Sequence, residues 1–383
     1  MKIAVPKEIL SNETRVAATP DIVKKYIELG FKVAVEKKAG EASGYSDKEY
    51  ENQGAEIVSK IGDLYKGADI ILKVSPFMTE NDKLDEMALL ESGMIVISNM
   101  NSLNDLERTK KLAQKGVTAF AMELMPRISR AQSMDILSSQ SNLAGYRAVI
   151  EAAYEYNGVF PMMMTAAGTV APTRVLVLGA GVAGLQAIAT AKRLGAIVSA
   201  YDVRPAVKEQ VESLGAKFVV VDEDATKEAE TKTGYAKEMN KTYQKKQEEV
   251  LTKQLEKTDV VICTALIMGK QAPVLINDDM LSVMKKGAVI VDLAVETGGN
   301  CSASQMDKIV EKEGVKVIGR SNMAGRVASN ASQLYAKNVF NFITQFFDSK
   351  TGSVDFNFDD DLVKGTCVAK EGKIVHNLLI KKG

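Results

Sequence analysis

A glycine-rich turn between a predicted strand and a predicted helix constrains the fold of this chain more than any other feature. An apolar run, Arg174–Leu178, enters the turn, and a helical pattern follows it. The turn has the spacing GxGxxG and contains Gly179, Gly181 and Gly184. The first glycine permits a tight turn, the second lets backbone N–H groups approach a ligand, and the third lets the helix pack against the strand. This order predicts a helix N-terminus that binds a phosphate group.

An acidic residue follows at the end of the next predicted strand, Val198–Asp202. In a strand–turn–helix–strand unit, a carboxylate at this place can bind a ribose 2′-hydroxyl. With the glycine turn, Asp202 therefore predicts a dinucleotide site. We expect NAD rather than NADP, because a carboxylate repels a 2′-phosphate, although the nearby Arg204 weakens that preference.

The composition excludes several classes of protein. The 383 residues include 49 basic and 49 acidic side chains, so the excess positive charge typical of nucleic-acid binding is missing. No apolar run approaches the roughly 20 residues that span a bilayer, so we expect no direct membrane insertion. Cys263, Cys301 and Cys367 are widely separated, which favours reduced thiols in a cytoplasmic protein over a disulfide or metal framework.

Short apolar runs alternate with amphipathic segments over the first 125 residues. The strands predicted here are Lys2–Val5, Lys32–Glu36, Ile70–Val74, Met94–Asn99 and Thr118–Glu123. The predicted helices are Pro20–Leu29, Asp47–Gln53 and Asn104–Gln114. This alternation indicates a mostly parallel sheet with helices on both faces.

A long helix, Ser133–Tyr156, is predicted to lead into a second α/β domain, with a capping box at Ser129–Gln132. Another, Ala328–Phe347, is expected to return the chain to the first domain. The remaining predicted strands are Lys217–Val221, Asp259–Thr264, Ala288–Asp292, Lys316–Ile318, Thr366–Ala369 and Ile374–Leu379.

The predicted fold class is therefore α/β, with two Rossmann-like domains whose mostly parallel sheets are joined by long helices around a cleft. The N-terminal domain comprises residues 1–138 and 327–383, and the Rossmann domain comprises residues 139–326. The segment Asp222–Lys257 is dense in Lys and Glu where such a unit normally has a short connection. It is either a solvated helix or a mobile loop, near residues 222–250, whose Tyr235 covers a bound nucleotide.

Few residues could transfer a proton to or from a substrate. The sole histidine, His376, lies in the C-terminal tail, and we do not expect it to be catalytic. Lys73 and Arg15 could hold a substrate carboxylate, or they could form structural salt bridges.

A polar segment precedes the first long helix and lies at the expected domain junction, where clefts form. Asp135 and Ser138 share a helical face at positions i and i+3. These groups could orient a nicotinamide ring, or they could simply cap the helix. Thr264–Leu266, at the carboxyl end of a predicted strand, would form the opposite wall. The groups on the loop entering the helix are Arg127, Ser129, Arg130 and Gln132.

Longer segments resemble the alanine dehydrogenase/pyridine nucleotide transhydrogenase family, from near residue 1 to beyond residue 340. The segments that carry this resemblance are Asn12–Pro20, Leu72–Val74, Gly179–Gly184 and Val291–Ala294. Those similar to the transhydrogenase branch are Pro126–Ser133, Asn142–Arg147, Asp202–Pro205, Thr264–Pro273 and Ser332–Tyr335.

The resemblance implies the NAD(H)-binding component of a bacterial proton-translocating transhydrogenase, which transfers hydride directly between NADH and NADP⁺. It implies catalytic roles in orienting the nicotinamide for Arg127, Asp135 and Ser138, and in arranging the partner domain for Gln132. Neighbouring residues implied to contact the cofactor are Ser129, Ser133 and Met134. Those implied on the Rossmann domain are Gly179, Ala180, Gly181, Val182, Gly184, Asp202, Val203, Arg204, Gly234, Tyr235, Met239, Thr264, Ala265 and Leu266.

One position departs from the alanine dehydrogenases. Where they carry a substrate histidine after a strand, this chain has Asn101, while Arg15 and Lys73 match. Direct transfer between two nicotinamides requires the positioning of two rings and no proton removal at the reacting carbon. The missing histidine therefore favours the transhydrogenase interpretation.

The resemblance also implies the partners. We expect a homodimer on the cytoplasmic face of the bacterial inner membrane, attached through a transmembrane subunit that translocates protons. NADP(H) is expected only on a separate partner domain, and no nucleic acid is expected. Two alternatives remain: a stand-alone amino-acid dehydrogenase that uses Lys73, and a non-enzymatic NADH sensor.

Overall fold

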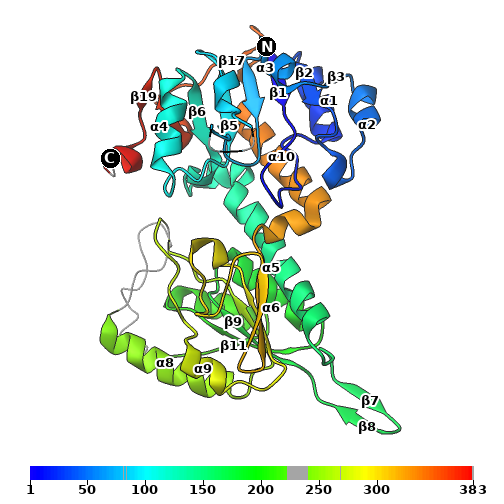
Figure 1. Ribbon diagram of the computed structural model, residues 1–383, viewed down its shortest axis with the longest axis vertical. Helices are drawn as coiled ribbons and strands as arrows, with labels where there is room; N and C mark the ends of the chain where they lie inside the picture. The colour runs from blue at the N-terminus through cyan, green and yellow to red at the C-terminus, as the bar shows by residue number, and fades with distance from the viewer. Residues whose placement is uncertain (81, 83, 222–239, 268, 382–383) are drawn as a thin grey trace. The chain divides into compact units, whose positions relative to one another are not determined.

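The computed structural model describes residues 1–80, 82, 84–221, 240–267 and 269–381. The chain forms two compact units, which Figure 1 shows as ribbons. Unit 1 comprises Met1–Gln140 with Gly325–Gly383, and unit 2 comprises Ser141–Ala324. Both are α/β with a mostly parallel sheet, so the predicted fold class is confirmed.

Unit 1 contains a sheet with the strand order β19-β18-β6-β5-β4-β1-β2-β3, which is parallel except that β18 pairs antiparallel with both β6 and β19. Its strands are β1 (Lys2–Val5), β2 (Lys32–Glu36), β3 (Glu56–Val58), β4 (Ile70–Leu72), β5 (Ile95–Ser98), β6 (Thr118–Ala121), β18 (Cys367–Lys370) and β19 (Lys373–Ile374). The small hairpin β16 (Phe347–Asp348) and β17 (Ser353–Val354) stands apart from it. Its helices are α1 (Pro20–Glu28), α2 (Asp47–Asn52), α3 (Ile61–Tyr65), α4 (Leu106–Gln114), α10 (Ala328–Thr344), α11 (Asp361–Thr366) and α12 (Asn377–Ile380).

The sheet of unit 1 is buried on both faces. Ile3 and Val5 pack in one apolar cluster with residues of α1 and α10, whereas Ala4 packs in another with residues of α3 and α4. Because side chains of a strand alternate between faces, both sides of β1 are covered, as expected for a parallel sheet.

Unit 2 contains a sheet with the strand order β11-β10-β9-β12-β13-β15-β14, in which only β14 is antiparallel. Its strands are β9 (Arg174–Leu178), β10 (Ile197–Tyr201), β11 (Lys217–Phe218), β12 (Val260–Cys263), β13 (Val289–Asp292), β14 (Lys308–Lys312) and β15 (Val315–Gly319). Its helices are α6 (Val182–Arg193), α7 (Lys208–Ser213), α8 (Lys241–Leu255), α9 (Asp278–Ser282) and most of α5 (Ile136–Glu155). A hairpin, β7 (Met163–Thr165) and β8 (Gly168–Val170), projects from this unit (Figure 1).

The order of strands places a switch point in unit 2. The chain adds β10 and β11 on one side of β9 and then crosses to add β12 and β13 on the other. In open α/β sheets, ligands bind at the carboxyl ends of the strands beside such a reversal. The glycine turn follows β9 and therefore lies at this point.

The prediction for the start of the long helix was wrong. Residues Ser129–Met134 form a 3₁₀ helix without a side-chain cap, so the expected capping box is not formed. Asp135 is extended, with φ of −76° and ψ of 97°, which separates this turn from α5. The Asp135 carboxylate then accepts a hydrogen bond from Ser138 N at 3.0 Å and caps α5 instead.

Other predictions need smaller corrections. The predicted strand Ile374–Leu379 ends at Ile374, because the His376 ring accepts a hydrogen bond from Leu378 N and starts α12. Strands β3 and β14 and the hairpin β7–β8 were not predicted. Among the described residues, no helix combines the length and apolar character needed to cross a bilayer.

Helix α5 lies against the first turn of α6 within unit 2. A Cβ built on Gly145 would lie 2.1 Å from the backbone oxygen of Ala183, so any larger residue would separate the two helices. Gly145 therefore fixes the position of α6 and of the turn that precedes it.

We expect Gly145→Ala to lower the free energy of unfolding by about 3 kcal/mol, since the added methyl group forces the backbone apart. Urea denaturation followed by circular dichroism measures this loss. Gly62→Ala is the control, because Gly62 is also helical and a Cβ there meets nothing within 4 Å. It should be neutral or stabilise by up to about 1 kcal/mol. Equal stability of the two variants would contradict this account of the packing.

Candidate functional site

The turn between β9 and α6 forms a backbone cradle that only glycines permit. Gly179 has a φ of +93°, and a Cβ on Gly184 would lie 1.9 Å from the Gly179 oxygen. At Gly181, by contrast, an added Cβ would meet only the Arg204 Nη2, at 4.0 Å, so space above the turn is open. No side chain caps the N-terminus of α6. The residues present therefore fit a pyrophosphate bound to the first N–H groups of this helix.

Asp202 lies directly beyond β10, at the edge of the same cradle. Its Oδ2 accepts hydrogen bonds from Ala180 N at 2.8 Å and from Arg204 Nη2 at 2.7 Å. Its Oδ1 accepts from the backbone N of Arg204 at 2.8 Å and from Arg204 Nε at 2.9 Å. A carboxylate offers about four acceptor positions, so all of them are used within the chain.

The loop after β12 packs directly onto the glycine turn. Thr264 Oγ1 donates to the Gly179 oxygen at 2.9 Å. Ala265 is held through its backbone by the buried side chain of Asn300, while Leu266 is 49% exposed. Asn300 was not among the predicted residues, although the consecutive glycines that precede it, Gly298 and Gly299, signal a special turn. Unit 2 thus brings together the predicted glycines, Asp202–Arg204 and Thr264–Leu266.

Unit 1 brings together two of the predicted catalytic residues. Ser138 Oγ donates to Asp135 Oδ2 at 2.5 Å, in addition to the backbone bond that caps α5. Both side chains are only partly buried, so they keep polar atoms near the surface. The capping role and a ligand-binding role are compatible, since a carboxylate can accept further hydrogen bonds.

The remaining predicted residues of this segment differ in exposure. Met134 is 3% exposed and packs in the core of unit 1, so its side chain is covered by protein. Arg130 forms a bidentate ion pair with Asp360, at 2.8 and 2.7 Å, which ties the segment to the start of α11. Arg130 is exposed, as are the other members Arg127, Ser129, Gln132 and Ser133.

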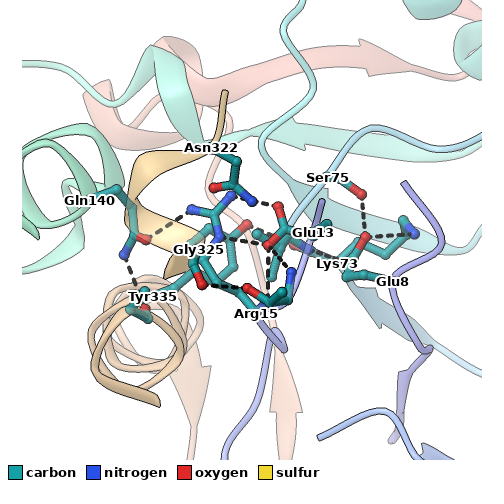
Figure 2. Close-up of polar contacts among 12 residues, drawn as sticks. Glu8, Glu13, Arg15, Lys73, Ser75, Gln140, Asn322, Gly325 and Tyr335 are labelled. Atoms are coloured by element: carbon teal, nitrogen blue, oxygen red, sulfur yellow. Dashed lines mark hydrogen bonds and ion pairs between the residues drawn. The ribbon is translucent and has the colours of Figure 1, made fainter. Parts of the chain in front are cut away.

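Lys73 is completely buried and ion-paired. Its Nζ lies 2.8 Å from Glu86 Oε1 and 3.2 Å from Glu8 Oε2, as Figure 2 shows in part. Burial alone would lower the pKa of the Lys73 ammonium, but the two carboxylates outweigh it and raise the pKa above its ordinary value. Lys73 therefore keeps its proton and cannot act as a general base near neutral pH.

Arg15 is likewise bound within unit 1. Its Nε and Nη2 bind the two carboxylate oxygens of Glu13 at 2.8 and 2.7 Å, and its Nη1 donates to Gln140 Oε1 at 2.9 Å (Figure 2). A bidentate pair of this kind is the contact a substrate carboxylate would otherwise make. The observed contacts of Arg15 and Lys73 are therefore structural salt bridges, the second of the two interpretations given above.

The two positions relevant to proton transfer by histidine are engaged in other contacts. His376 is buried, with Nε2 3.1 Å from the Gly365 oxygen while Nδ1 caps α12. Burial lowers the pKa of His376, opposed in part by the Gly365 contact, so the ring is neutral at pH 7. Asn101 is exposed, with a φ of +51° and its Oδ1 bonded to Asn104, and an amide cannot take up a proton.

The charged segment is described only in part. Gly234, Tyr235 and Met239 lie outside the described residues. From Lys241 the chain is helical, because α8 starts behind Asn240, whose side chain accepts from Tyr243 N at 2.9 Å. Residues 241–250, the last part of the expected loop, therefore belong to a helix.

Comparison with known proteins identifies the family. Residues 4–144 match the alanine dehydrogenase/PNT N-terminal domain, and residues 148–377 match the C-terminal domain. An NAD(P) transhydrogenase alpha subunit of Rhodospirillum rubrum is 55% identical over 383 residues, all of both chains. An alanine dehydrogenase of Halomonas elongata is 30% identical over 98% of this chain and 95% of its own. The crystal structure of transhydrogenase from Sinorhizobium meliloti matches with a TM-score of 0.87 and 48% identity, covering 98% of this chain and all of the other.

The chain belongs to the alanine dehydrogenase/PNT family, as its resemblance predicted. Within the family it is an oxidoreductase component of the transhydrogenase type, which binds a nicotinamide nucleotide. The cradle of unit 2 is the described part of the chain that fits such a nucleotide.

Proposed function

We propose that this chain is the NAD(H)-binding subunit of a proton-translocating transhydrogenase, which transfers hydride directly between NADH and NADP⁺. The observation that carries the proposal is that the candidate proton-transfer residues are engaged in structural contacts or replaced. Lys73 is held by two carboxylates, His376 caps a helix, and position 101 is an asparagine. An amino-acid dehydrogenase must remove a proton as well as a hydride, whereas transfer between two nicotinamides need not.

The order of strands supports an orientation for the dinucleotide. Its pyrophosphate binds above Gly179–Gly184, at the end of β9, while Asp202 beyond β10 binds the adenosine ribose. The nicotinamide half then extends over β12, on the other side of β9, next to Thr264–Leu266. Because Arg204 uses the Asp202 acceptor positions, nucleotide binding exchanges the guanidinium for ribose hydroxyls. The bound nucleotide supplies the hydride, and the chain supplies its orientation.

The polar segment of unit 1 has the second role in this proposal. Arg127, Asp135 and Ser138 orient the nicotinamide, and Gln132 arranges the domain that carries NADP(H). The hydrogen bond between Asp135 and Ser138 supports this, because it fixes both side chains before a ligand arrives. Proton translocation is assigned to a transmembrane subunit, to which this subunit attaches on the cytoplasmic face of the membrane.

We also propose a homodimer, formed through the hairpin β7–β8. Met162, Met163, Met164 and Val170 are 59, 47, 79 and 45% exposed, and residues 159–173 contain no charged side chain. Single chains rarely expose a contiguous apolar patch of this kind without a partner. The exposed backbone edges of a two-stranded hairpin can also pair with another strand.

The central test mixes the purified chain with an NADP(H)-binding domain and measures transfer between nicotinamide analogues. We expect transfer in the mixture only, and no oxidation of L-alanine by the chain alone. Arg127→Ala should reduce transfer by about a hundredfold, the scale for loss of a charge-assisted positioning contact. Arg130→Ala, on the same segment, should retain transfer, because Arg130 binds Asp360. Enzyme-like alanine oxidation would overturn the function, and an unchanged rate in Arg127→Ala would overturn the site.

Asp202→Asn tests the preference for NAD(H). The amide can still accept from Ala180 N, but it no longer repels a 2′-phosphate and no longer pairs with Arg204. We expect the ratio of NADPH to NADH affinity to rise by about tenfold or more, measured by calorimetry. Asp259→Asn is a matched control: Asp259 is similarly buried and paired with Lys285, but it lies before β12, at the amino end. An equal shift in both variants would contradict the role of Asp202.

The proposed dimer interface predicts that substitutions in the hairpin β7–β8 lower the mass of the protein in solution. Introducing charge with Met162→Asp and Met164→Asp should yield monomers in sedimentation velocity, because carboxylates cannot be buried without partners. Val274→Asp alters a residue that is also exposed, at 61%, elsewhere in unit 2, and should leave the dimer intact. A monomeric unsubstituted chain would refute the proposal.

A further inference from the structure

The loop after β12 is held by a residue from a distant part of unit 2. Asn300 is fully buried, and its Oδ1 accepts a hydrogen bond from Ala265 N at 2.9 Å. Its Nδ2 donates to the Ala265 oxygen at 2.9 Å and to the Pro273 oxygen at 2.8 Å. One amide therefore binds both backbone groups of Ala265 and a second point of the same loop.

Asn300 is itself held by a buried carboxylate at the end of β13. Asp292 Oδ2 accepts from Asn300 N at 2.7 Å, from Cys301 N at 3.0 Å and from Ser304 Oγ at 2.6 Å. Gly299 precedes Asn300 with a φ of +87°, and a Cβ on it would lie 2.9 Å from Asp292 Oδ2. Position 299 therefore favours glycine, whose backbone conformation places the Asn300 side chain against Ala265.

The held loop touches the nucleotide cradle. A Cβ built on Gly179 would lie 2.9 Å from Ala265 N, so the backbone that Asn300 binds also packs against the glycine turn. If Ala265 moved, Thr264 and Leu266 would move with it, because they are its chain neighbours. The position of this wall of the cradle therefore depends on one side-chain amide.

We infer that Asn300, anchored by Asp292, is a positioning residue for the nicotinamide half of the bound nucleotide. It acts through the backbone of Ala265 and does not itself touch the ligand. This inference rests on the proposed function, and specifically on the placement of the adenosine half over β10 and of the nicotinamide half over β12. Removal of the amide takes away the partner of both backbone groups of Ala265, which are partly buried, so the loop loses its fixed geometry.

The test compares two nucleotides on Asn300→Ala. NADH covers both halves of the site, whereas 5′-AMP covers only the adenosine half. We expect calorimetry to show NADH binding weakened by about tenfold and 5′-AMP binding changed by less than about twofold. General destabilisation would weaken both nucleotides together. Asn300→Ser, which keeps a polar group at lower volume, provides the same comparison if the alanine variant does not fold.

Asn277→Ala is the matched control. Asn277 is an asparagine of the same unit that caps α9 by accepting from Met280 N at 2.9 Å, and its Nδ2 donates to Glu248 Oε1 at 2.6 Å. Its substitution should lower stability and leave both affinities unchanged. If the unsubstituted chain bound no NADH, the proposed function would fail. If it bound NADH, and both Asn300 variants bound it equally well or lost both nucleotides in parallel, the inference about Asn300 would be overturned.

Discussion

The position of the first turn of α6 depends on two close backbone contacts, each of which requires a glycine. Gly184 lets the helix approach the Gly179 oxygen, and Gly145 lets α5 approach the oxygen of Ala183, one residue earlier. These contacts have no room for a methyl group, so the helix has one position relative to β9. Thr264 then bonds the Gly179 oxygen from the neighbouring strand, and the cradle becomes rigid on the side where the nicotinamide is proposed to lie.

Much of the fold could be predicted because it rests on local patterns. β1 and β2 coincide with the predicted residues, since short apolar runs bounded by polar or glycine residues identify buried strands. The start of α5 was misplaced because Ser129 and Asp135 are both residue types that favour an N-cap, and only Asp135 forms one. Neither α12, where a histidine replaces the usual cap, nor β14, whose pattern is mostly exposed, could be predicted.

The candidate site also contains residues that the sequence predicts and residues that only the fold brings together. The glycine turn and Asp202 have a fixed spacing along the chain, so their chemistry can be read from the sequence. Asn300 and Asp292 follow no such spacing, and their role appears only when the end of β13 is placed beside the end of β12. Lys73 and Arg15 are the opposite case: their types suggest anion binding, but the neighbouring carboxylates of Glu8, Glu86 and Glu13 already neutralise them.

The ion pair between Asp202 and Arg204 has a consequence for turnover. A buried acid without partners would destabilise the empty subunit, and Arg204 satisfies it from only two residues away. With the ribose placed at Asp202 as proposed, Arg204 competes with it for the carboxylate. In the proposed function, a departing NAD⁺ is replaced by a group that is already attached to the chain, so the free energy gained when the Asp202–Arg204 pair forms again favours product release. The proposed hydride transfer requires the subunit to exchange its nucleotide after every turnover, and this competition limits how tightly the nucleotide is bound.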